Sequence, residues 1–170
     1  MNARPACTPR ELATQASAAS KPRVLVLGYG NPGRGDDGLG PAAAAAIETV
    51  AWPGVSVQDN YQLVIEDAAD IAEHDVVWFV DAARSGAEPY EIRKLSAVYG
   101  SAFTSHLLKP ETLLAIVEQL YCRSPEAYLL GIRGYEFDFR EGLTDRARDN
   151  LAQAVAAMRQ KIGKLREQAR

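Results

Sequence analysis

The 170-residue sequence lacks the features that mark several large classes of protein. Its two cysteines, Cys7 and Cys122, lie far apart without a C-x-x-C pair, which indicates a cytosolic protein and not a disulfide-rich secreted one. A net charge of −3 provides no basic surface for nucleic acid. No apolar run approaches the roughly 20 residues that span a bilayer, and residues 1–21 lack the apolar stretch of a signal peptide. We therefore expect a cytoplasmic protein that binds neither nucleic acid nor membranes.

Apolar strands alternate with amphipathic helices along most of the chain. Residues 1–21 are rich in Ala, Ser and Thr and are predicted to be a flexible tail, whereas 22–170 forms a single α/β domain. Strands are predicted at 24–27, 55–59, 76–80, 90–95 and 127–132, and helices at 41–50, 62–74, 110–120 and 145–165, the last with Thr144 as its N-cap. This alternation predicts a three-layer sandwich around a mostly parallel, doubly wound sheet, with the flavodoxin-like strand order 2-1-3-4-5.

The first strand leads into the loop of the stretch VLVLGYGNPGRGDDGLGP, residues 24–41. Its Gly28, Gly30 and Gly33 match the G-x-G-x-x-G of a dinucleotide-binding turn. Three features count against a nucleotide: about ten residues separate strand and helix, Pro32 lacks an amide donor, and two aspartates follow where phosphates would lie. A nucleotide-binding module is therefore the weaker interpretation of this loop.

Two carboxylates are expected to meet at one edge of the sheet. Asp37 follows the first strand and Asp81 ends the third, and neighbouring parallel strands place such residues side by side. Paired carboxylates share a proton or bind a cation, whereas Asp36 is better explained as a cap of the helix that follows. His106 follows the fourth strand and is expected at the same edge of the sheet as the two aspartates, where it could serve as a metal ligand. His74 is expected at the opposite edge.

Three segments together resemble the nickel–iron hydrogenase maturation endopeptidases: VLVLGYGNPGRGDDGLGP, VVWFVDAA and FTSHLL, within residues 22–160. The resemblance implies an α/β sandwich that removes a C-terminal peptide from the nickel-loaded precursor of the hydrogenase large subunit. It also implies that Asp37, Asp81 and His106 bind the metal, and that Asp37 and Asp81 are the candidate catalytic residues. Nickel would arrive with the precursor, and zinc or cadmium could occupy the site in vitro. The remaining signature residues, expected to shape the loop, are Gly28, Gly30, Asn31, Asp36 and Gly38.

Other functions stay open at the level of sequence. H-E-x-x-H is absent, and no serine or cysteine is paired with a base as a nucleophile. A non-catalytic metal-binding adaptor or chaperone for the same large subunit would need the same three ligands. The alternation of Tyr135, Phe137 and Phe139 with polar residues predicts either a half-buried strand or the edge of a groove for a partner's extended tail.

Overall fold

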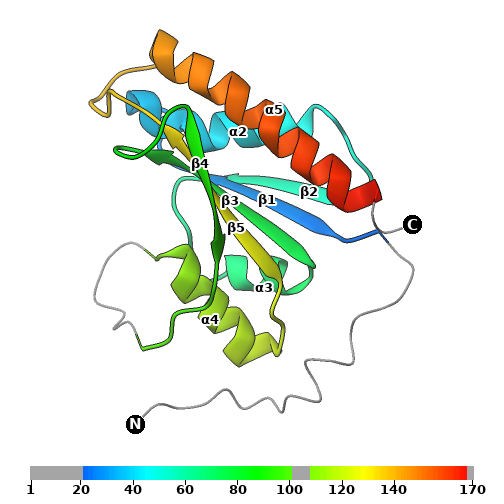
Figure 1. Ribbon diagram of the computed structural model, residues 1–170. Helices are drawn as coiled ribbons and strands as arrows, with labels where there is room; N and C mark the ends of the chain where they lie inside the picture. The colour runs from blue at the N-terminus through cyan, green and yellow to red at the C-terminus, as the bar shows by residue number, and fades with distance from the viewer. Residues whose placement is uncertain (1–20, 101–107, 168–170) are drawn as a thin grey trace.

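The computed structural model describes residues 21–100 and 108–167, which fold around one five-stranded sheet (Figure 1). In chain order the elements are β1 (Val24–Tyr29), η1 (Gly35–Gly38), α2 (Leu39–Glu48), β2 (Val55–Asn60), α3 (Asp67–Ala72), β3 (Val76–Ala83), β4 (Tyr90–Leu95), α4 (Pro110–Tyr121), β5 (Glu126–Arg133) and α5 (Asp145–Glu167). The strands are ordered β2-β1-β3-β5-β4, and all pairs are parallel except β4 with β5. The predicted α/β sandwich class is confirmed.

Helices cover both faces of the sheet, which is why its central strands are apolar throughout. Helices α2 and α5 pack on one face and α3 and α4 on the other (Figure 1). Along β1, for example, Val24 and Val26 belong to the first core, and Leu25 and Leu27 to the second. A strand whose alternate side chains both face a helical layer must be hydrophobic at every position.

The edge of the sheet differs from the expected order. β5, not β4, lies beside β3, and β4 is the antiparallel edge strand. Only residues 84–89 connect β3 to β4, too few for the crossover helix that a parallel strand requires. β4 therefore runs in the opposite direction to β3, and β5 lies between the two strands. The pairing of β1 with β3, from which the meeting of Asp37 and Asp81 was predicted, is confirmed.

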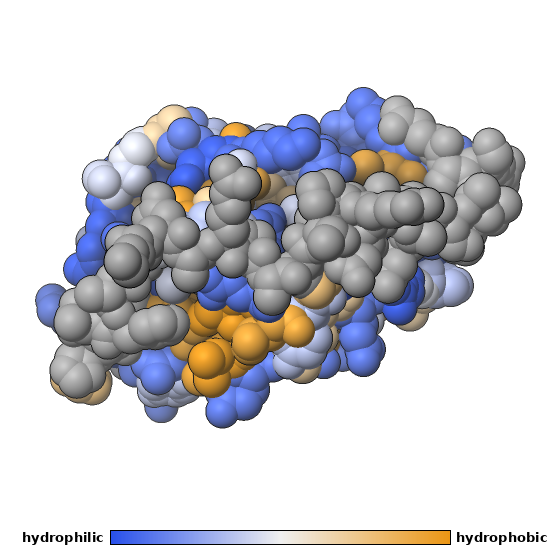
Figure 2. Space-filling view, turned by 90° about the horizontal axis from the view of Figure 1, so that it is seen from below, coloured by the Kyte–Doolittle hydropathy of each residue, from blue (hydrophilic) through white to orange (hydrophobic). Residues whose placement is uncertain are grey.

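The layer of α3 and α4 also presents apolar side chains to the outside. Figure 2 views the molecule from this side and shows apolar surface among hydrophilic residues. Large exposed side chains of this layer and of the turn before α3 include Ile65, Leu120 and Tyr121. Within the described residues, no helix combines the length and the apolar character needed to cross a membrane.

Candidate functional site

The glycines after β1 serve close backbone packing. A Cβ atom on Gly28 would overlap the carbonyl oxygen of Gly40 in α2, and one on Gly40 would overlap the carbonyl oxygens of Tyr29 and Val80. The first turn of α2 therefore lies directly on the ends of β1 and β3, where a dinucleotide would place its pyrophosphate. Gly30 has a φ of 141°, and a Cβ there would overlap the carbonyl oxygen of Asp37. This arrangement argues against the nucleotide interpretation.

Asp36 is fully buried and ties the loop to the segment that precedes α5. Its Oδ2 accepts hydrogen bonds from the backbone N–H groups of Tyr135 (2.8 Å) and Glu136 (3.1 Å) and from the hydroxyl of Thr144 (2.9 Å). Its Oδ1 accepts from the Thr144 N–H at 2.7 Å. Burial alone would raise the pKa of Asp36, but these hydrogen bonds outweigh it and lower the pKa. Asp36 is thus a structural anchor and does not cap α2, which has no side-chain cap.

The segment of residues 134–144 does not form the half-buried strand that its alternation suggested. Its one bridge, among the described residues, pairs Arg140 with Arg34. Phe137 is buried, but Phe139 is 89% exposed, with the Arg34 guanidinium 5.5 Å from its ring centre. Thr144 caps α5 as expected, because its hydroxyl oxygen accepts a hydrogen bond from the Ala147 N–H at 3.2 Å.

Asp37 is half-buried beside the end of β1. Its Oδ2 accepts a hydrogen bond from the Asn31 N–H at 3.0 Å, and the Asn31 side chain in turn accepts one from the Gly33 N–H at 2.8 Å. Gly38 permits this fold of the loop, since a Cβ there would lie 3.0 Å from the Cα of Pro32. The expected loop residues therefore fix the direction of the Asp37 carboxylate.

Asp81 lies near the carboxyl end of β3 and is mostly shielded from water. Burial raises its pKa to about 6, against the lowering effect of hydrogen bonds from the Ala82 N–H and the Tyr29 hydroxyl. The charge of Asp37 raises the pKa further, so the two carboxylates are close enough to repel each other. The structure thus brings together the pair that strand topology predicted.

Tyr29 is a site residue that the sequence analysis missed. It ends β1 with its side chain on the same face as Leu27, and it is level with Asp81 because Gly28 pairs with Val80. Burial, followed by the charge of Asp81, raises its pKa, so the phenol stays protonated and donates its hydrogen bond to Asp81. The sequence contains one indication of this role: Tyr29 follows the apolar strand at the same two-residue spacing as Leu25 and Leu27, which places the three side chains on one face of the sheet.

His106 lies outside the described residues, and its role as a ligand stays a prediction. The expected position of His106 requires the strand before it to be parallel to β3. Instead β4 is antiparallel and ends at the opposite edge of the sheet, with Leu95 beside Ala127. The described chain resumes at Leu108, and Glu111 in the first turn of α4 is near enough to Tyr29 to contribute to its raised pKa. Among the described residues no three His, Cys, Asp or Glu side chains form a metal site.

The opposite edge of the sheet has different chemistry. His74 lies there as expected, just before β3, with its Nε2 2.9 Å from the Ser56 hydroxyl.

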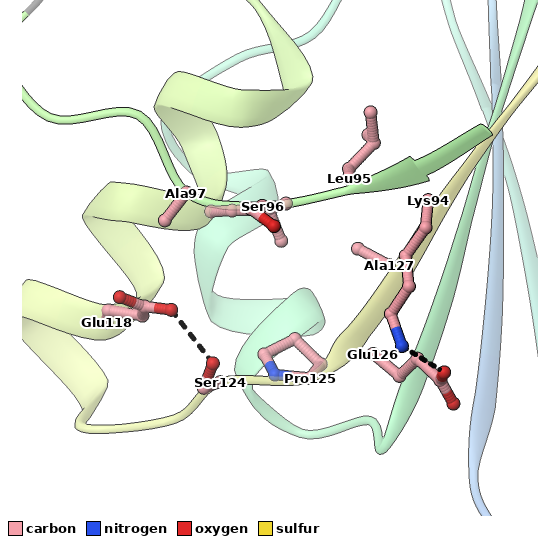
Figure 3. A pocket seen from close by; sticks show the side chains of 10 residues that line it. Lys94, Leu95, Ser96, Ala97, Glu118, Ser124, Pro125, Glu126 and Ala127 are labelled. Atoms are coloured by element: carbon pink, nitrogen blue, oxygen red, sulfur yellow. Dashed lines mark hydrogen bonds and ion pairs between the residues drawn. The ribbon is translucent and has the colours of Figure 1, made fainter.

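A cavity of about 340 Å³ also opens at this edge, between the end of β4 and the start of β5 (Figure 3). Its charged side chains already have partners: Lys94 binds Glu126 at 2.7 Å, and Ser124 donates to Glu118 at 2.8 Å. We therefore place the candidate site at Asp37 and Asp81.

Comparison with solved structures identifies the architecture that carries this carboxylate pair. The chain has the fold of the hydrogenase maturation proteases. The nickel–iron hydrogenase maturation protease HycI from Thermococcus kodakarensis superimposes with a TM-score of 0.66 at 23% identity, over 85% of this chain and 95% of that one. The hydrogenase 2 maturation peptidase from a Thaumarchaeota archaeon gives 0.63 at 23% identity, over 83% and 98%. The endopeptidase HybD from Escherichia coli gives 0.58 at 21% identity, over 82% and 93%. No family model and no curated protein sequence matches the chain.

Proposed function

We propose that this chain is a hydrogenase maturation endopeptidase, a peptide hydrolase that removes a C-terminal peptide from the nickel-loaded precursor of a nickel–iron hydrogenase large subunit. One observation carries the proposal. Within the fold of these proteases, Asp37 and Asp81 converge at the carboxyl ends of adjacent strands, the position at which open α/β sheets bind their ligands. The resemblance of the loop sequences to the same endopeptidases supports it independently.

The carboxylate pair fits a divalent cation. Burial raises the pKa of Asp81, and the charge of Asp37 raises it further, so a cation bound between the two carboxylates would relieve their repulsion. Asp37 uses Oδ2 for the Asn31 N–H, which leaves Oδ1 without a hydrogen bond from any described residue. With His106 as the third ligand, the set of one imidazole and two carboxylates suits nickel, and zinc or cadmium in vitro. The nickel belongs to the substrate, so only a nickel-loaded precursor completes the site.

The reaction is hydrolysis of one peptide bond. Water adds its hydroxyl to the carbonyl carbon, the C–N bond breaks, and the released amine takes the remaining proton. Nickel carried by the substrate would be held by Asp37, Asp81 and His106; there it would supply recognition of the precursor, and its charge would be available to polarise the carbonyl. In the protein, Asp37 and Asp81 hold the nickel-bearing end of the precursor, and Tyr29 and the Ala82 N–H fix the orientation of Asp81.

The test is a processing assay with purified full-length protein and candidate large-subunit precursors, with and without nickel, read by mass spectrometry. We expect loss of a C-terminal peptide from the nickel-loaded precursor only. Asp37→Asn and Asp81→Asn should keep the fold and abolish processing. Asp59→Asn is the matched control, because Asp59 is an exposed aspartate near the same edge in β2.

The assay also separates the alternatives. Nickel-dependent binding of the precursor without any mass loss would replace the protease with an adaptor or chaperone. Cleavage that is independent of nickel would refute the recognition role of the metal. Thermal stabilisation by NAD or FMN would favour the nucleotide-binding module.

A further inference from the structure

Four residues from four strands form a row across the carboxyl edge of the sheet. Asp81 pairs with Gly131, and Gly131 pairs with Glu91 on the edge strand β4. Tyr29 is level with Asp81 on its other side, since Gly28 pairs with Val80. All four lie on the α3 and α4 face, in phase with Leu27, Phe79, Leu129 and Leu95 of the core on that face. Gly131 is the one member of the row without a side chain, and it directly adjoins Asp81.

A hollow of about 100 Å³ lies over Gly131. Four of the residues that line it are small or apolar, namely Ala83, Ala87, Leu129 and Gly131. Glu91 and Arg93 also border it, and Arg93 is bound to Glu111 at 2.8 Å. Small and apolar residues therefore line the hollow together with the polar side chains of Ser85, Glu91 and Arg93.

Neither the backbone nor the packing requires glycine at position 131. Its φ is not among the positive values that favour glycine, and a Cβ there would meet only the Cβ of Ala83, at an ordinary contact distance of 3.5 Å. Glycine weakens the interior of a strand, and alanine would fit here. What glycine provides is the space over position 131, which is next to Asp81 in the sheet.

We propose that this hollow is a substrate subsite that receives a small aliphatic side chain of the precursor, next to the bond that is cleaved. The proposal rests on the proposed function. A volume of about 100 Å³ equals roughly three water molecules, enough for one such side chain. Asp81 is the neighbour of Gly131 on β3, and adjacent strands lie about 4.8 Å apart, so a side chain bound over Gly131 would lie close to the carboxylate pair. Successive side chains of an extended peptide point to opposite sides, so one enters the hollow while its neighbours stay outside.

Filling the hollow tests the proposal. In the full-length protein, Gly131→Ala and Gly131→Val should keep or raise the melting temperature. We expect kcat/KM for the nickel-loaded precursor to fall at least tenfold with Ala and further with Val, while metal affinity measured by titration stays within twofold. Gly163→Ala is the matched control: it adds a methyl group in open space within α5 and should not change the kinetics.

A second arm varies the precursor. Replacing the aliphatic residue beside the cleaved bond with glycine should lower kcat/KM for the wild-type enzyme and have little further effect on Gly131→Val, because both changes remove the same contact. Undiminished kcat/KM in a folded Gly131→Val variant overturns the subsite and leaves the protease assignment intact. A parallel loss of metal binding would assign the effect to a displaced Asp81 and also overturn it. Failure of the wild type to cleave any precursor refutes the proposed function and the subsite together.

Discussion

The adjacent residues Asp36 and Asp37 should respond to substitution in opposite ways. Asp36 is fully buried and accepts four hydrogen bonds, whereas Asp37 is half-buried and accepts one from the described residues. A hydrogen bond to a charged group contributes about 1.5–3 kcal/mol, and such contributions within one network are not additive. We therefore expect Asp36→Ala to lower the free energy of unfolding by about 3–5 kcal/mol, among the larger effects of single substitutions.

The conservative variant sharpens this expectation. Asp36→Asn can retain the three hydrogen bonds at the Oδ2 position, but its NH₂ group then faces the Thr144 N–H, and two donors oppose each other. We expect a loss of about 1–3 kcal/mol from this variant, because one buried donor is left unsatisfied. Asp37→Asn should change stability by less than about 1 kcal/mol and abolish processing instead.

Urea and thermal unfolding followed by circular dichroism measure these differences. For a domain of this size each kcal/mol shifts the melting temperature by about 2–4 °C, so Asp36→Ala should melt about 6–20 °C below the wild type. The pH dependence gives a second check. The pKa of Asp36 is lowered in the folded state, so its contribution is present above the unfolded pKa of 3.8 and is lost as the pH falls below it. Equal stability of wild type and Asp36→Ala at pH 7 would refute the anchoring role.

Three further predictions concern the site. Because the pKa of Asp81 is raised from 3.8 to about 6, the folded protein loses stability as the pH rises through this interval. The Asp81→Asn variant should therefore unfold at a higher denaturant concentration than the wild type at pH 7, and at the same concentration at pH 3.5. Gly30→Ala should lower the melting temperature, because the added Cβ overlaps the Asp37 carbonyl oxygen, while the matched Gly163→Ala should not. His106→Ala should abolish nickel-dependent processing and His74→Ala should leave it unchanged; equal effects in the mass assay would contradict the ligand assignment.

The sequence alone determined the fold class and one pair of site residues. The unbroken apolar stretches of β1 and β3 showed that both faces of the central strands are covered, which is a property of each strand by itself. Because such strands are adjacent in the doubly wound order, the convergence of Asp37 and Asp81 followed from their places at the strand ends. The length of the loop and its acidic residues likewise argue against a nucleotide.

Only the tertiary structure decided the features that depend on register between distant segments. Periodicity within residues 90–95 does not reveal whether β4 pairs with β3 or β5, or in which direction; the short connection and the later entry of β5 decide this. Asp36 finds its partners about a hundred residues away, at positions with no local signal of their own. The row from Tyr29 to Glu91, and the hollow over Gly131, exist because four strands align at one level. Local patterns identify elements, whereas the alignment of those elements depends on packing across the whole sheet.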